Sequence, residues 1–126
     1  MPIAVTAEQL AMADSVAQWA NRAGTIRAVR DLEECGGHPG AADEQAAARW
    51  AALAELGVFS IAVPQTFGGA GGTAADVAVV AEQLAAVLAP GPVMPTLLAG
   101  LVLAKAVSAG EDSTAARQLE PVPASR

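Results

Sequence analysis

Aromatic and basic side chains are both scarce in this sequence. Its 126 residues include no tyrosine, two tryptophans and two phenylalanines, and seven Lys and Arg stand against 13 Asp and Glu. The formal net charge is −6 at pH 7, and the basic residues form no cluster. Because such a surface repels a phosphate backbone, the composition argues against nucleic-acid binding. It argues equally against docking on anionic lipid.

Cysteine is nearly absent as well. The lone Cys35 cannot form an internal disulfide, which fits a reducing compartment. No basic, apolar-cored leader opens the chain, since its first positive side chain is Arg22. We therefore expect a cytoplasmic protein.

One long stretch, residues 83–104, lacks charge altogether. It is long enough on paper to cross a bilayer, which takes about 20 residues. Pro90, Gly91, Pro92 and Pro95 interrupt it, however, and would free backbone groups that lipid cannot satisfy. The stretch predicts two buried helices joined by a turn, and no membrane span.

Apolar residues are abundant, at 53 % against 16 % charged residues, which excludes a polar disordered chain. Much of the apolar count is alanine, which favours helices and allows them to pack closely. The length suits one domain with a modest core. We expect residues 1–126 to form a single helical domain, with a frayed tail over 120–126.

Helical spacing of apolar residues predicts five or six helices. Thr6 and Gln9 form a capping-box pattern, and Gly24 is a suitable stop. The second predicted helix is Thr25–Glu34, and the third is capped by Asp43 and closed by Gly57. The fourth is capped by Thr73, and the fifth follows the Pro90–Pro95 turn and ends at Gly110. A last short helix is predicted to start at Ser113. The predicted apolar stripes are Leu10, Ala13, Val16, Ala17, Ala20 and Ala23 on the first helix, Ile26, Val29 and Leu32 on the second, Ala46, Trp50, Leu53 and Ala54 on the third, Val77, Val80, Ala81, Leu84 and Leu88 on the fourth, and Leu97, Leu98, Leu101, Val102 and Val107 on the fifth.

Between the third and fourth predicted helices, Val58–Val63 has the composition of a strand, but no partner strand is evident, so it is either a strand or extended chain. Pro64–Gly72 is a glycine-rich loop. Helices with short connections predict an all-α fold, an antiparallel bundle.

The run Gly69-Ala70-Gly71-Gly72-Thr73-Ala74 fits the outline of a dinucleotide-binding fingerprint, because it follows a β-like stretch and opens a helix. Five residues separate that stretch from Gly69, no second strand follows, and no acidic residue lies about 20 positions on to bind a ribose. A structural turn is the better interpretation.

Other candidate chemistry is weak. Cys35 and His38 could share a metal or act as nucleophile and base, yet no other Cys or His exists to complete a site. Asp76 and Glu82 lie six apart on one predicted helix and diverge. A solvated cluster is predicted for Asp31, Glu33 and Glu34. We therefore assign no catalytic, cofactor-binding or metal-binding residue to this chain.

Two longer patterns point to a family. These are Trp50-x-x-Leu53-Ala54-Glu55-Leu56-Gly57-Val58 and Val63-Pro64-Gln65-x-Phe67-Gly68-Gly69-x-Gly71-Gly72, followed by Asp76, Val80, Glu82, Leu84 and Leu88-Ala89. Together they resemble the N-terminal helical domain of acyl-CoA dehydrogenases, and the likeness extends from about Thr6 to Leu119. The Pro90-Gly91-Pro92 turn and the Leu-rich helix after it are similar to actinobacterial members that act on bulky or unusual acyl chains. Gln65 departs from the acidic residue that the family commonly has there.

The resemblance implies a role for this chain in a larger flavoenzyme. Family members hold FAD between a β-rich domain and a C-terminal bundle, which also supplies the glutamate base, and the N-terminal helices form a wall at the deep end of the acyl tunnel. By position, the resemblance offers six candidates for acyl contact, although all six could equally be ordinary core: Val93, Met94, Thr96, Leu97, Gly100 and Leu101. Its partners would be acyl-CoA in the complete enzyme and the remaining domains or a partner subunit.

Without those domains the chain is expected to be inactive, to hold no FAD alone and to self-associate through its uncovered apolar face. Two other functions stay open. The chain could be a helical interaction module without enzymatic role, or a small carrier for an apolar ligand, although six short helices would enclose little space.

Overall fold

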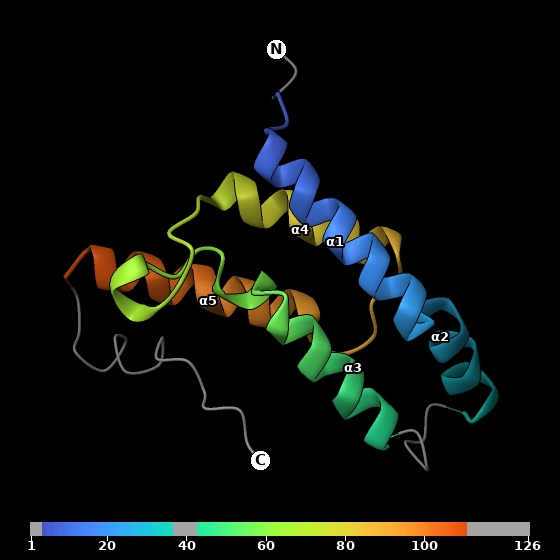
Figure 1. The fold of residues 1–126 in the computed structure, drawn as a ribbon. Helices are drawn as coiled ribbons and strands as arrows, with labels where there is room; N and C mark the ends of the chain where they lie inside the picture. Colours follow the sequence, from blue (N-terminus) through green and yellow to red (C-terminus); the bar gives the residue numbers. More distant parts are fainter. Residues whose placement is uncertain (1–3, 37–42, 111–126) are drawn as a thin grey trace.

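The computed structural model describes residues 4–36 and 43–110. These residues form five α-helices and two 3₁₀ turns (Figure 1). The helices are α1 (Ala7–Ala23), α2 (Thr25–Glu34), α3 (Asp43–Glu55), α4 (Ala74–Ala86) and α5 (Val93–Ser108), and the 3₁₀ turns are η1 (Val58–Ser60) and η2 (Gln65–Phe67). No strand occurs in these ranges, so the predicted all-α fold is confirmed.

Helix α1 begins and ends where its sequence predicts. The Thr6 hydroxyl accepts from the Gln9 backbone N–H at 3.2 Å, and the Gln9 side chain accepts from the Thr6 N–H at 3.0 Å. This reciprocal cap satisfies two donors that the first turn leaves without helical partners. Gly24 ends the helix in the left-handed conformation, with φ of 61°, and α2 starts at the next residue.

Helices α1 and α4 lie side by side and run parallel (Figure 1). Near their N-terminal ends, Gln9 Nε2 donates to Asp76 Oδ1 at 2.6 Å. Beyond their C-terminal ends, the buried Thr25 hydroxyl donates to the Val87 carbonyl at 2.6 Å. The consecutive helices α4 and α5 run antiparallel, as short connections require, but α1 and α4 are not consecutive and escape that constraint (Figure 1).

The core lies where α1, α3, α4, α5 and the η1 segment meet. Its largest fully buried side chains are Leu53, Leu84, Val16, Val58 and Val80. Each of these helices contributes one apolar stripe, which is how an amphipathic helix buries its surface in a small domain.

The predicted stripes need corrections on four helices. On α2, Ile26 is 52 % exposed, and on α5, Leu98 and Val102 are 53 % and 65 % exposed, so these three side chains lie outside the core. On α1, Leu10 is 56 % exposed, whereas Trp19, which the predicted stripe omits, is only 4 % exposed. The buried face is therefore rotated toward Trp19, because burying a large indole removes more apolar surface from water than burying alanines does. On α3, Leu53 is buried but Ala46 and Ala54 are exposed.

The strand-like segment Val58–Val63 is neither strand nor extended chain. It forms η1 and a further turn, with the Ser60 N–H donating to the Gly57 carbonyl at 3.1 Å and the Val63 N–H to the Ser60 carbonyl at 3.2 Å. Val58, Ile61 and Val63 are all buried. The β-branched composition of this segment reflects its burial, because a 3₁₀ helix followed by a turn can bury apolar side chains as well as a strand can.

Two boundaries near α5 also differ from expectation. Helix α4 ends at Ala86, so Leu88 lies beyond it, 52 % exposed and with φ of 51°. Helix α5 begins at Val93 and includes Pro95, because a proline in the first helical turn lacks an N–H that the helix does not use. None of the described helices is both long and apolar enough to cross a membrane. The helix expected from Ser113 and the tail 120–126 lie outside the described residues.

Candidate functional site

The glycine-rich turn uses its own amides to hold itself together. Four successive backbone N–H groups donate inward: Gly69 to Pro64 O at 3.2 Å, Ala70 to Ser60 O at 3.1 Å, Gly71 to Val63 O at 2.8 Å and Gly72 to Ile61 O at 2.7 Å. A phosphate-binding loop must instead point free N–H groups at its ligand. The interpretation of this run as a structural turn is therefore confirmed.

Close packing explains why two of these positions are glycine. A Cβ atom on Gly69 would lie 2.1 Å from the Val63 carbonyl oxygen. One on Gly72 would lie 2.9 Å from both the Ile61 carbonyl oxygen and Asp76 Oδ2. The turn thus fits tightly against η1 and the start of α4, and its glycines serve that fit.

The titratable candidates do not converge in the described residues. Cys35 is exposed, and His38 lies outside the described ranges. No group of three or more potential metal ligands occurs in the described residues. The Thr73 backbone N–H, the Gln9 amide and the Thr73 hydroxyl all donate to the Asp76 carboxylate, and they hold its pKa below the ordinary value. Asp76 is thus a capping residue of α4.

The six candidates for acyl contact divide by burial. Val93 and Leu97 are only 5 % and 3 % exposed and belong to the core cluster. Thr96 and Leu101 are half-buried, and the Thr96 hydroxyl donates to the Pro92 carbonyl at 2.6 Å. Met94 is 46 % exposed.

The sixth candidate, Gly100, and the turn before α5 lie close to two aromatic residues, Trp50 and Phe59. Trp50 of α3 stacks on Phe59 of η1, with ring centroids 4.7 Å apart and planes inclined by 28°. Gly91 lies against this pair, since a Cβ atom there would be 3.3 Å from Trp50. A Cβ on Gly100 would be 3.4 Å from the Phe59 carbonyl oxygen. The Trp50 ring therefore packs against the turn before α5, and the backbone of η1 packs against α5 at Gly100.

The outer side of α5 carries exposed apolar side chains over about two turns. Met94, Leu98 and Val102, spaced four residues apart, are 46 %, 53 % and 65 % exposed. Such spacing aligns side chains on one face of a helix. A contiguous exposed apolar face on a small domain marks a surface for a ligand or another chain segment.

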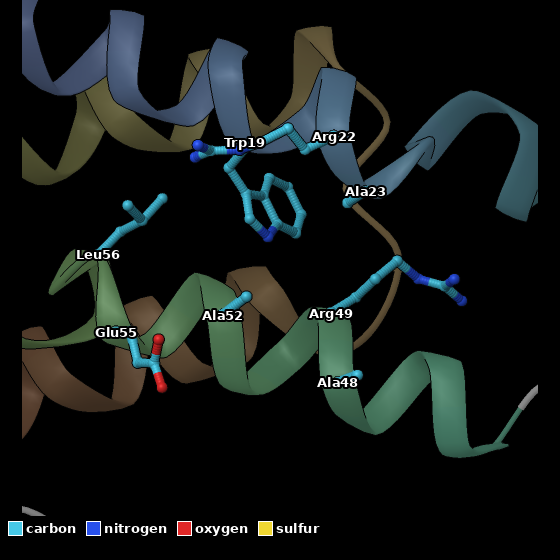
Figure 2. Close-up of a pocket in the computed structure, with 8 residues that line it drawn as sticks. All are labelled: Trp19, Arg22, Ala23, Ala48, Arg49, Ala52, Glu55 and Leu56. Carbon is cyan, nitrogen blue, oxygen red and sulfur yellow. The ribbon is translucent and has the colours of Figure 1, made fainter.

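A second surface feature is a groove of about 530 Å³ between α1 and α3 (Figure 2). Its lining residues are Trp19, Arg22, Ala23, Ala48, Arg49, Ala52, Glu55 and Leu56. From the sequence, helical periodicity places Trp19 on the first helix and Arg49 on the third. Because the two helices are far apart in sequence, the periodicity of each one does not predict that these side chains line the same groove.

Comparison with known proteins agrees with this architecture. The family model described as the N-terminal domain of acyl-CoA dehydrogenase matches residues 6–124. The acyl-CoA dehydrogenase FadE34 of Mycobacterium tuberculosis is 40 % identical over 120 residues, which covers 88 % of this chain and 17 % of FadE34. This chain belongs to the acyl-CoA dehydrogenase family.

A second relative matches a shorter part. The acyl-CoA dehydrogenase IpdE2 of Mycolicibacterium smegmatis is 46 % identical over 55 residues, covering 43 % of this chain and 18 % of IpdE2. IpdE2 of Mycobacterium tuberculosis is 42 % identical over the same length. No solved structure matches the chain significantly. FadE34 matches most of this chain, but the chain spans only about a sixth of the length of FadE34.

Proposed function

We propose that this chain is the N-terminal helical domain of an enzyme that removes hydrogen from the α and β carbons of acyl-CoA thioesters and passes it to FAD. The family match over residues 6–124 supports this most directly. In that enzyme the domain contributes one wall of the acyl chamber and packs against the remaining domains, in the cytoplasm. The chemistry itself belongs to residues outside this chain.

FAD does not fit the one turn of the described residues that has a nucleotide-binding outline. The N–H groups of residues 69–72 are all engaged, and a larger side chain at Gly69 would collide with backbone, so no free cradle faces outward. We therefore place the flavin site in the other domains of the enzyme and derive no catalytic step from this chain.

Helix α5 provides the proposed wall. Its N-terminal half carries the six candidate residues, and their burial suggests two roles. Met94 and Leu101 retain exposed surface with which to touch an acyl chain, whereas Val93 and Leu97 fix the helix on the core. Thr96 and Gly100 line the same half, whose position depends on the close approach of Trp50 to Gly91 and of the Phe59 carbonyl to Gly100.

The prolines around Gly91 stiffen the approach to this wall, and we propose that the stiff turn makes room for a wide acyl group. Proline fixes its own φ angle, so the turn loses little further entropy when ligand binds. In the complete enzyme, equal turnover of short straight and bulky acyl thioesters would count against this selectivity.

Co-expression tests the proposed function. The chain purified alone is expected to show no flavin absorbance and no acyl-CoA-dependent dye reduction. Co-expression with the coding sequence that follows it in the genome is expected to yield a flavin-containing complex that reduces the dye. In that complex, Leu101→Phe should lower kcat/KM for long acyl thioesters more than for short ones, while the matched change Ala51→Phe on the exposed side of α3 should not. Dye reduction by the isolated chain would contradict the proposal.

The exposed stripe of α5 also supports the alternative, a helical interaction module without enzymatic role. That function predicts a stable dimer or larger assembly on size exclusion and no flavin complex with the downstream product. A Leu98→Glu variant separates the two, since it would dissolve a self-assembly formed through this stripe.

A further inference from the structure

The groove between α1 and α3 contains two buried hydrogen-bond donors that have no acceptor. Trp19 Nε1 and Arg49 Nε are both inaccessible to solvent and unpaired in the described residues. A buried donor without a partner costs about 1–3 kcal/mol, so a native fold rarely retains one without a reason. Here two such donors lie on facing helices at the same groove.

The two side chains approach the groove from opposite sides. Trp19 is only 4 % exposed, and its ring extends from α1 toward α3 with the nitrogen-bearing edge facing α3 (Figure 2). Arg49 rises from α3 at the end of the groove nearer Ala23, and its guanidinium extends outward from there (Figure 2). The indole therefore spans the groove, and the arginine closes one end of it.

The charges at the rim are also unmatched. Neither Arg22 nor Arg49 has an ion-pair or hydrogen-bond partner in the described residues, and the acidic Glu55 lies at the end of the groove away from Arg49 (Figure 2). Three alanines, Ala23, Ala48 and Ala52, keep the floor shallow and apolar. A volume of about 530 Å³ is within the range of small-molecule sites, which is roughly 300–1,000 Å³.

From these features we propose that the α1–α3 groove binds a small amphipathic carboxylate. The carboxylate accepts charge-assisted hydrogen bonds from the outward end of the Arg49 guanidinium, because Arg49 Nε and Trp19 Nε1 are themselves inaccessible. The apolar body lies along the alanine floor and Leu56. Arginine presents a planar fork of donors that matches a carboxylate, and an apolar body in the groove removes the exposed methyl groups of Ala48 and Ala52 from water. This site is distinct from the wall on α5 and does not depend on the proposed dehydrogenase function.

Trp19 provides the readout. The chain has two tryptophans and no tyrosine, so the Trp50→Phe variant reports from Trp19 alone. Titrating this variant with decanoate is expected to give a saturable shift of the fluorescence emission. The control ligand 1-decanol has the same length but no charge, and it should give a shift only at concentrations at least about tenfold higher. Far-UV circular dichroism confirms that each protein is folded.

Two pairs of variants, each made in the Trp50→Phe background, locate the site. Arg49→Gln is expected to weaken decanoate binding about tenfold, whereas Arg30→Gln, which removes an exposed charge from α2, leaves it unchanged. Ala52→Leu fills the floor and should abolish the shift, while Ala51→Leu adds the same volume outside the groove and should not.

Several outcomes would overturn the proposal. These are a titration without saturation, equal affinities for decanoate and decanol, and an Arg49→Gln variant that binds like its parent. A spectral change that follows protein concentration and not decanoate would also overturn it, because the groove would then be occupied by a second copy of the chain.

Discussion

The side chains of Gln9 and Asp76 join the first turns of two helices that are 67 residues apart in sequence. Gln9 Nε2 donates to Asp76 Oδ1 at 2.6 Å. Each residue also completes the capping box of its own helix, Gln9 with Thr6 on α1 and Asp76 with Thr73 on α4. Two local caps thus become one network, which fixes the parallel alignment of α1 and α4 at their N-terminal ends.

Removing Asp76 should therefore destabilise the domain more than removing Gln9. Asp76→Ala loses the reciprocal cap of α4 and the link to α1, and we expect it to lower the free energy of unfolding by about 1–2 kcal/mol. Gln9→Ala loses a weaker neutral cap and the same link, and should cost about 1 kcal/mol. Urea denaturation of both variants and of the double variant gives the coupling between them. Strictly additive effects would show that the link contributes nothing.

The lowered pKa of Asp76 makes a prediction about acid. Hydrogen bonds from the Thr73 N–H, the Gln9 amide and the Thr73 hydroxyl favour the charged carboxylate in the folded state. The unfolded chain then binds a proton more readily, so the stabilisation is present above the ordinary pKa of 3.8 and is lost as the pH falls through the lower folded value. Thermal melts from pH 7 to pH 3 should show a steeper loss for the parent than for Asp76→Asn. Parallel curves would exclude this contribution.

Local features of the fold were predictable because their causes are local. The cap at Thr6, the stop at Gly24, the span of α2 and the cap at Thr73 all depend on residues within one turn of each other. The parallel pairing of α1 with α4 was not predictable, since it depends on a bond between distant residues. The strand or extended chain expected at Val58–Val63 is wrong for a similar reason, because its β-branched side chains are buried by packing against distant helices, which composition does not reveal.

The candidate site was predictable only as a segment. The resemblance selects the start of α5, and helical spacing predicts the burial of Leu97, but the sequence does not reveal that Leu98 and Val102 face outward. The groove beside Trp19 has no sequence pattern at all, because its floor is made of alanines that look like ordinary helix formers.

Gly69 should be the least replaceable glycine of the described residues. Gly69→Ala would place a Cβ atom 2.1 Å from the Val63 carbonyl oxygen, and backbone must move to relieve that collision. We expect a loss of about 3 kcal/mol or more in the free energy of unfolding. Gly24→Ala is the matched control, since a Cβ there meets no atom within 4 Å and only the left-handed φ is strained, at a cost of about 1 kcal/mol. Equal losses in chemical denaturation would show that the turn yields easily.

Leu88 is a residue whose replacement by glycine should stabilise the protein. It follows α4 with φ of 51°, where the Leu88 N–H donates to the Ala85 carbonyl at 3.1 Å and the Ala89 N–H to the Leu84 carbonyl at 3.0 Å. These two bonds form the helix ending in which glycine is usual, because a side chain in the left-handed region costs about 1–2 kcal/mol.

Since Leu88 is 52 % exposed, Leu88→Gly loses only part of its buried surface and should gain about 0.5–1 kcal/mol in the free energy of unfolding. Ala85→Gly, at an exposed position inside α4, should lose about 1 kcal/mol by urea denaturation, which controls for the flexibility of glycine. A destabilised Leu88→Gly variant would mean that the leucine packs more firmly than its exposure indicates. Contacts of the Leu88 side chain within the domain would then offset the strain of its left-handed backbone.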